Sequence, residues 1–76
     1  MIYTVVGIRT GEFNDKKGEL IRFGHLHVTY TDPEVSGIAV ELVKANPDLF
    51  RNIACGDEIR IDRNGTGRVM AIEKLS

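Results

Sequence analysis

The fold of this chain is decided by residues 2–31, IYTVVGIRTGEFNDKKGELIRFGHLHVTYT. Two arms rich in β-branched and aromatic residues flank the polar segment NDKKG, a pattern typical of a long β-hairpin. In the second arm, apolar and polar residues alternate from His25 to Tyr30, which places the apolar side chains on one face of a strand. Gly7, Gly11 and Gly24 interrupt the arms, and glycines inside strands often mark the bulges and bends that let long strands coil into a small barrel.

A second hairpin is predicted at the other end of the chain. The segments DEIRID (57–62) and RVMAIEKL (68–75) flank RNGTG, and Ile59 and Ile61 lie two apart so that they face the same way. Asn64 and Gly65 are a strong turn signal because both residue types tolerate positive φ. These residues predict the last two strands.

The segment between the hairpins is ambiguous. Asp32-Pro33-Glu34 resembles the start of a helix and AVELVKAN contains good helix formers, so a long helix covering an α+β sheet is one alternative. Ser36-Gly37 disfavours that helix, and the alternation over residues 38–43 favours a strand. After it, Asn46 and Pro47 predict a capped short helix, PDLFRNI, with Leu49, Phe50 and Ile53 directed to the core.

The predicted order is therefore three strands, a short helix and two strands, in one domain over residues 1–76. That is the order of the mainly β, five-stranded Greek-key barrel called the OB-fold, whose sheet face and loops bind oligonucleotides and oligosaccharides. The helix between the third and fourth strands is expected to plug one end of the barrel.

Composition and charge exclude several classes of protein. The net charge of −1 argues against binding duplex DNA by bulk electrostatics, although a local basic groove with stacking aromatics remains compatible with it. No apolar run approaches the length of a membrane span, the N-terminus lacks the features of a signal peptide, and the single Cys55 fits a reducing compartment. We expect a cytoplasmic protein with no membrane association.

No local signature of catalysis is present. A nucleophile beside a base, paired carboxylates and a phosphate-binding glycine loop are all missing, so we expect no enzyme activity and no cofactor. His25 and His27 point to the same side of a strand, but no third ligand is evident and we expect no metal. A histidine ring can also stack on a nucleobase.

Basic and aromatic residues gather in two places. Around the first turn, cationic groups able to contact phosphates stand beside rings able to stack bases: Arg9, Phe13, Lys16, Lys17, Arg22 and Phe23. The alternative is a solvated mixed-charge hairpin with both phenylalanines packed into the core. Arg60, Arg63 and Arg68 form a second cluster around the last turn, which on an OB barrel lies at one end of the binding face, although ordinary cross-strand ion pairs are an equal alternative.

The strand order and the motifs GEFNDKKGELIRFGHLHV (11–28), PDLFRNIACGDEIRI (47–61) and NGTGRVMAIEKL (64–75) carry a resemblance. The chain resembles the small OB-fold single-stranded DNA-binding proteins of bacteriophages and bacterial mobile elements, and is similar to the helix-destabilising protein of filamentous phages. The resemblance implies a homodimer that coats single strands in the bacterial cell during phage or mobile-element replication and recombination. It assigns the grip on DNA to the long hairpin, and the net acidic charge departs from the more basic family members.

Two hypotheses from different classes follow. The first is a coating module for single-stranded DNA, or RNA, without sequence specificity. The second is a protein-interaction or assembly domain that uses an apolar strand edge and binds no nucleic acid.

Overall fold

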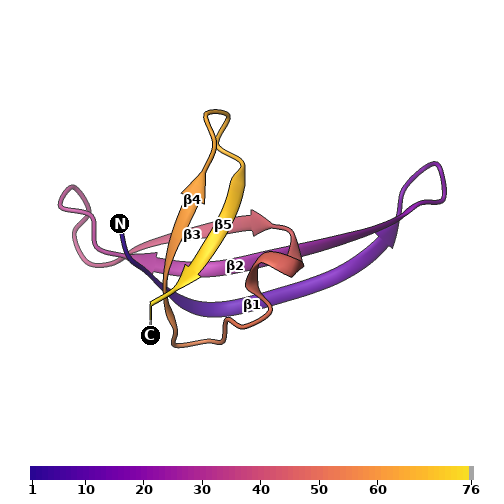
Figure 1. Cartoon of the computed structure of the whole chain (residues 1–76). Helices are drawn as coiled ribbons and strands as arrows, with labels where there is room; N and C mark the ends of the chain where they lie inside the picture. The colour runs from indigo at the N-terminus through magenta and orange to yellow at the C-terminus, as the bar shows by residue number, and fades with distance from the viewer. Residues whose placement is uncertain (76) are drawn as a thin grey trace.

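Five antiparallel strands form one sheet in the computed structural model, which describes residues 1–75. The strands are β1 (Tyr3–Asn14), β2 (Leu20–Tyr30), β3 (Ala39–Ala45), β4 (Glu58–Arg63) and β5 (Val69–Lys74), and their order in the sheet is β3-β2-β1-β4-β5 (Figure 1). The prediction of a mainly β fold is confirmed, and the middle segment is a strand, so the alternative of a long covering helix is wrong.

The sheet is not closed, and the expected barrel is wrong in this respect. β3 and β5 are the two edges of the sheet, whereas closure requires them to pair. β1 reaches β4 through only two residue pairs, Tyr3–Ile59 and Thr4–Glu58, and the β4–β5 hairpin then crosses the face of the other three strands (Figure 1). Between the end of β3 and the start of β5, side chains line a hollow where a barrel would have ladder hydrogen bonds.

The expected helix PDLFRNI is shorter and of another type. It is a four-residue 3-10 helix, η1 (Pro47–Phe50), capped by the Asn46 side chain, which accepts a hydrogen bond from the Asp48 N–H at 2.9 Å. With no barrel to close, η1 does not plug an end but packs against β2 and β5. The Phe50 ring lies directly on the backbone of Gly24, where an added Cβ would be 2.4 Å from the ring.

The core lies between the β1–β2–β3 layer and the β4–β5 hairpin. Its side chains are Tyr3, Val5, Leu26, Val28, Val43, Phe50, Ile53, Ile59 and Val69. Leu26 and Val28, two apart on the inner side of β2, both contribute, as the alternation predicted. Asn64 shapes the last turn with its side chain, which accepts from the N–H groups of Thr66 and Arg68, and the positive φ of the turn falls on Gly67 rather than on Asn64 and Gly65.

β1 and β2 continue beyond all other strands as a two-stranded arm, which we define as residues 11–23. β3 pairs with β2 only as far as Gly24, so in the arm β1 and β2 pair only with each other. A bulge between Val5 and Gly7 lets β1 bend on its way into the arm. The molecule is consequently elongated, with extents of 45 × 25 × 21 Å (Figure 1).

Gly24→Ala is expected to lower the free energy of unfolding by about 1–3 kcal/mol, because the new methyl group collides with the Phe50 ring and with the Ala45 carbonyl oxygen, 2.9 Å away. The matched control is Gly65→Ala, where a Cβ meets nothing within 4 Å, and there the change is neutral or stabilising by about 0.4–1 kcal/mol. Urea unfolding of both variants measures the difference, and equal midpoints would contradict this account of the Gly24 contact.

Candidate nucleic-acid interface

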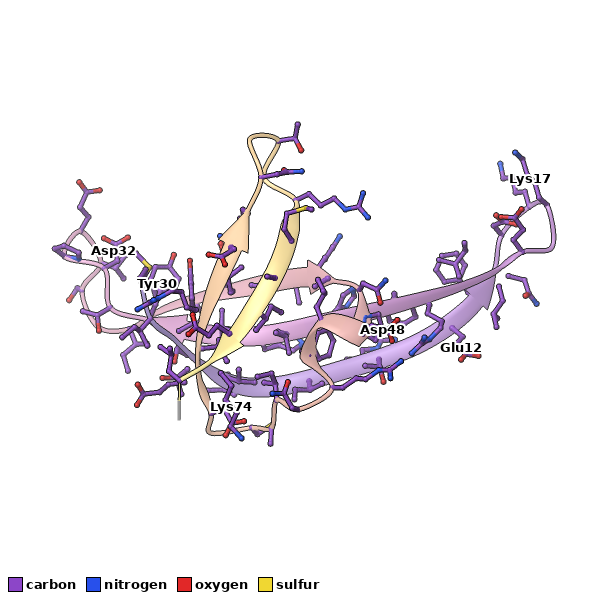
Figure 2. All side chains as sticks on the ribbon, viewed as in Figure 1. Glu12, Lys17, Tyr30, Asp32, Asp48 and Lys74 are labelled. Atoms are coloured by element: carbon purple, nitrogen blue, oxygen red, sulfur yellow. The ribbon has the colours of Figure 1, made fainter. Side chains whose placement is uncertain are left out.

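The two faces of the arm have different chemistry. Residues directly opposite each other in an antiparallel pair share a face, and Gly11 is opposite Phe23 while Phe13 is opposite Ile21. This register puts Arg9, Phe13, Phe23 and His25 on the outer face, away from the β4–β5 hairpin. Glu12 and Arg22 are opposite each other on the inner face, on the side of η1 (Figure 2).

The outer face carries a row of rings. The Phe23 ring lies across Gly11, where a Cβ would be 2.5 Å from its Cζ, and its centroid is 6.2 Å from Phe13 and 5.3 Å from His25. The Arg9 guanidinium carbon is 5.7 Å from the Phe23 centroid. Phe13 is 52% exposed and neither phenylalanine belongs to the core, so the alternative in which both are core residues is wrong.

The tip of the arm presents Lys16 and Lys17 to solvent (Figure 2). The nearest acidic side chain in sequence, Asp15, is used by the turn itself. Its Oδ1 accepts hydrogen bonds from the N–H groups of Lys17 at 2.8 Å and Glu19 at 2.9 Å. With this carboxylate capping the turn, neither lysine has an ion-pair partner within residues 1–75.

Arg22 is held away from the row of rings. Its Nη1 lies 3.3 Å from Asp48 Oδ1 on η1, and the same oxygen accepts from Arg51 Nη2 at 2.7 Å. The hydrogen bond from Arg51, assisted by the charges of Arg51 and Arg22, lowers the pKa of Asp48. The structure therefore separates Arg22 from the other hairpin residues named from the sequence.

Two of the three arginines near the last turn are also in ion pairs. Arg60 pairs with Glu73 on β5, with 3.9 Å between Nη1 and Oε2, and Arg63 pairs with Glu41 on β3 at 3.2 Å. The Tyr3 hydroxyl and Glu41 together raise the pKa of Arg63. The cross-strand alternative therefore describes Arg60, whereas the partner of Arg63 lies on β3, which is not a neighbour of β4 in the sheet.

Arg68, the third arginine near the last turn, lies close to the arm. It lines a hollow of about 360 Å³ together with Phe23, His25 and Lys44. Lys44 was not anticipated from the sequence. It is opposite His25 in the β2–β3 register, and so it shares the outer face with the rings.

Ion pairing divides the ten lysines and arginines into two equal groups. Five have a carboxylate partner within 4.0 Å: Arg22, Arg51, Arg60, Arg63 and Lys74. The other five, which have none within residues 1–75, are Arg9, Lys16, Lys17, Lys44 and Arg68. We call these five cations, with Phe13, Phe23 and His25, the outer strip.

Other kinds of site receive no support from the part of the chain that is described. Residues 1–75 hold no group of three or more His, Cys, Asp or Glu side chains placed to bind a metal ion. In the same residues no helix is long and apolar enough to span a membrane. No protein-family model matches this chain, and comparisons with curated proteins and with solved structures likewise gave no match.

Asp48→Asn is expected to change how stability depends on pH. Because the folded-state pKa of Asp48 is below its value of 3.8 in the unfolded chain, its ion pairs stabilise the fold above about pH 4, and this contribution is lost as pH falls through the folded pKa. The variant should therefore be less stable than the wild type near neutral pH and should match it in acid. Urea midpoints across this range measure the difference, with Asp62→Asn, an exposed carboxylate outside the ion pairs of residues 1–75, as control. A constant gap between Asp48→Asn and wild type at all pH values would contradict the assignment.

Proposed function

We propose that this chain is a binding module for single-stranded nucleic acid, principally DNA, that acts without sequence specificity and catalyses no reaction. The observation that carries the proposal is the row of Phe13, Phe23 and His25 on the outer face of the β1–β2 hairpin, beside the guanidinium of Arg9. Aromatic faces stack on bases of any sequence, and stacking contributes about 1–3 kcal/mol per base.

The charges of the outer strip support the same function. Its cations extend from Lys16 and Lys17 at the tip, past Arg9, to Lys44 and Arg68 beside the end of β3. Lacking carboxylate partners among residues 1–75, they need not break an ion pair to contact a phosphate. The chain can thus combine a net charge of −1 with a locally basic surface.

Single strands suit this surface better than duplexes. Stacking on Phe13 requires a base whose face is free, and the bases of a duplex are stacked on each other. Binding by phosphate contacts alone would serve a duplex equally, but it demands the large basic excess that this chain lacks.

Phe13→Ala is expected to weaken binding of a fluorescently labelled thymidine strand by about tenfold, the equivalent of about 1.4 kcal/mol of lost stacking. The matched control is Leu20→Ala, which removes a side chain of similar exposure, 59% against 52%, from the inner face of the same arm. Fluorescence anisotropy at low and moderate salt, with unlabelled duplex as competitor, gives the affinities. Equal affinities of the two variants, or full competition by duplex, would refute the proposal.

A second candidate function, protein interaction through self-association, is favoured by a different surface. Val6, Val40 and Leu42 line a hollow of about 360 Å³ with His27 on the outer face of β1–β3, and Val40 is 75% exposed. Val40 and Leu42 lie on β3, an edge strand whose backbone groups pair with β2 on one side only. Such an edge is self-complementary, because two copies of one strand can pair antiparallel about a two-fold axis, so the occupant we propose is a second copy of this chain.

Leu42→Lys is expected to convert a dimer into a monomer, since it places a charge in the centre of that apolar edge. Sedimentation equilibrium at increasing protein concentration measures the mass, and Leu20→Lys, on an exposed apolar residue of the arm beyond the end of β3, is the control. A wild type that remains monomeric at every concentration removes the support for this candidate.

A further inference from the structure

Two hollows adjoin at the end of β3. The first, described above, contains Phe23 and His25 of the outer strip, and the second, of about 350 Å³, lies between the end of β3 and the start of β5. The two share the residues Lys44, Ala45, Asn46 and Arg68. A polymer that leaves the row of rings can therefore pass from one hollow into the other between Lys44 and Arg68.

The second hollow is lined by both apolar and polar residues. Leu49, Val69 and Met70 form the apolar part, and Met70 is 55% exposed, so its thioether is accessible to a flat ring. Among the polar lining residues, the side-chain oxygen of Asn46 accepts from the Asp48 N–H, while its amide nitrogen donates to no group within residues 1–75. That amide offers hydrogen-bond donors to a ligand.

Charge distinguishes these hollows from a third one. The hollow under the inner face of the arm, of about 550 Å³, is lined by Glu12 as well as by Arg22 and Arg51, both of which are paired with Asp48. Neither of the two adjoining hollows is lined by a carboxylate from residues 1–75. In a chain with eleven acidic residues, this leaves the end of β3 as a place suited to an anion.

We propose that the hollow between β3 and β5 is a nucleobase subsite, and that Lys44 and Arg68 bind the backbone phosphate of the nucleotide that enters it. This inference rests on the proposed function, and it adds a path: the strand stacks along the arm, crosses the end of β3 and places a further base against Met70 and Leu49. Asn46 donates to an acceptor on the base edge, and every base carries such acceptors, so the subsite tolerates any sequence.

The path has a consequence for the length of the ligand. An oligonucleotide of about four residues occupies the arm alone, while one of about ten residues reaches the second hollow, both lengths being within the site sizes known for small single-strand binders. Affinity in the wild type should rise steeply between these lengths, because the longer strand adds a stacked base and the contacts of two cations.

The test compares thymidine strands of about four and about ten residues with the wild type and with a Lys44→Ala, Arg68→Ala double variant, by anisotropy over a salt titration. For the long strand, the double variant should bind about tenfold more weakly and lose about 1.4 from the salt slope, about 0.7 for each cation removed. For the short strand it should bind like the wild type. The control is Arg51→Ala with Arg60→Ala, which removes the same charge from residues outside both hollows and should leave both strands unaffected.

The outcomes separate this inference from the function on which it rests. Equal weakening for both lengths, or no weakening for either, overturns the base subsite while leaving the arm as a binding surface. A wild type that binds neither strand overturns the proposed function itself. Met70→Glu, which puts a carboxylate into the second hollow, should reproduce the loss for the long strand only, and equal binding of the long strand by this variant and by wild type also overturns the subsite.

Discussion

The contact between the Phe50 ring and the backbone of Gly24 determines how the rest of the molecule is arranged. Because β2 has no side chain at this point, the ring of η1 lies directly on the strand, and the pair formed by Gly24 and Ala45 is the last one between β2 and β3. Beyond it β3 ends, the chain turns into η1, and β2 continues with β1 as its only partner. The 3-10 helix, the end of the third strand and the start of the arm therefore all meet at this contact.

A second glycine, Gly11, helps to position the aromatic rings of the arm. Phe23 lies across Gly11 on the outer face, so its ring is supported by backbone and keeps the rings of Phe13 and His25 beside it. On the inner side of the arm, Asp48 forms ion pairs with both Arg22 and Arg51. Backbone contact positions the rings on the outer face, whereas ion pairing holds Arg22 on the inner face with η1.

Features of the fold that depend on local sequence pattern could be predicted from the sequence. Features that depend on contacts between residues far apart in the chain could not. Alternation and turn residues were sufficient for five strands, and Asn46 with Pro47 was sufficient for the start of η1. Closure of the barrel depends on whether β3 meets β5, which no local pattern encodes. Arg22 finds Asp48 26 residues away, Arg63 finds Glu41 22 residues away, and Lys44 joins the outer face only through the β2–β3 register, so none of these placements follows from spacing.

Several carboxylates of this acidic chain are engaged away from the outer strip or within the turn of the arm. Four of them neutralise cations outside the outer strip, namely Glu41, Asp48, Asp57 and Glu73, and a fifth, Asp15, is engaged by the turn of the arm. Asp32 lies in the β2–β3 loop, at the opposite end of the molecule from Lys17 (Figure 2).

This distribution limits what charge alone can contribute to binding. With the five unpaired cations of residues 1–75, phosphate contacts can contribute a salt slope of at most about 3.5, at about 0.7 per contact. Base stacking must therefore supply much of the affinity under the proposed function. For this reason we expect the rings of the arm, rather than its charge, to contribute most to binding.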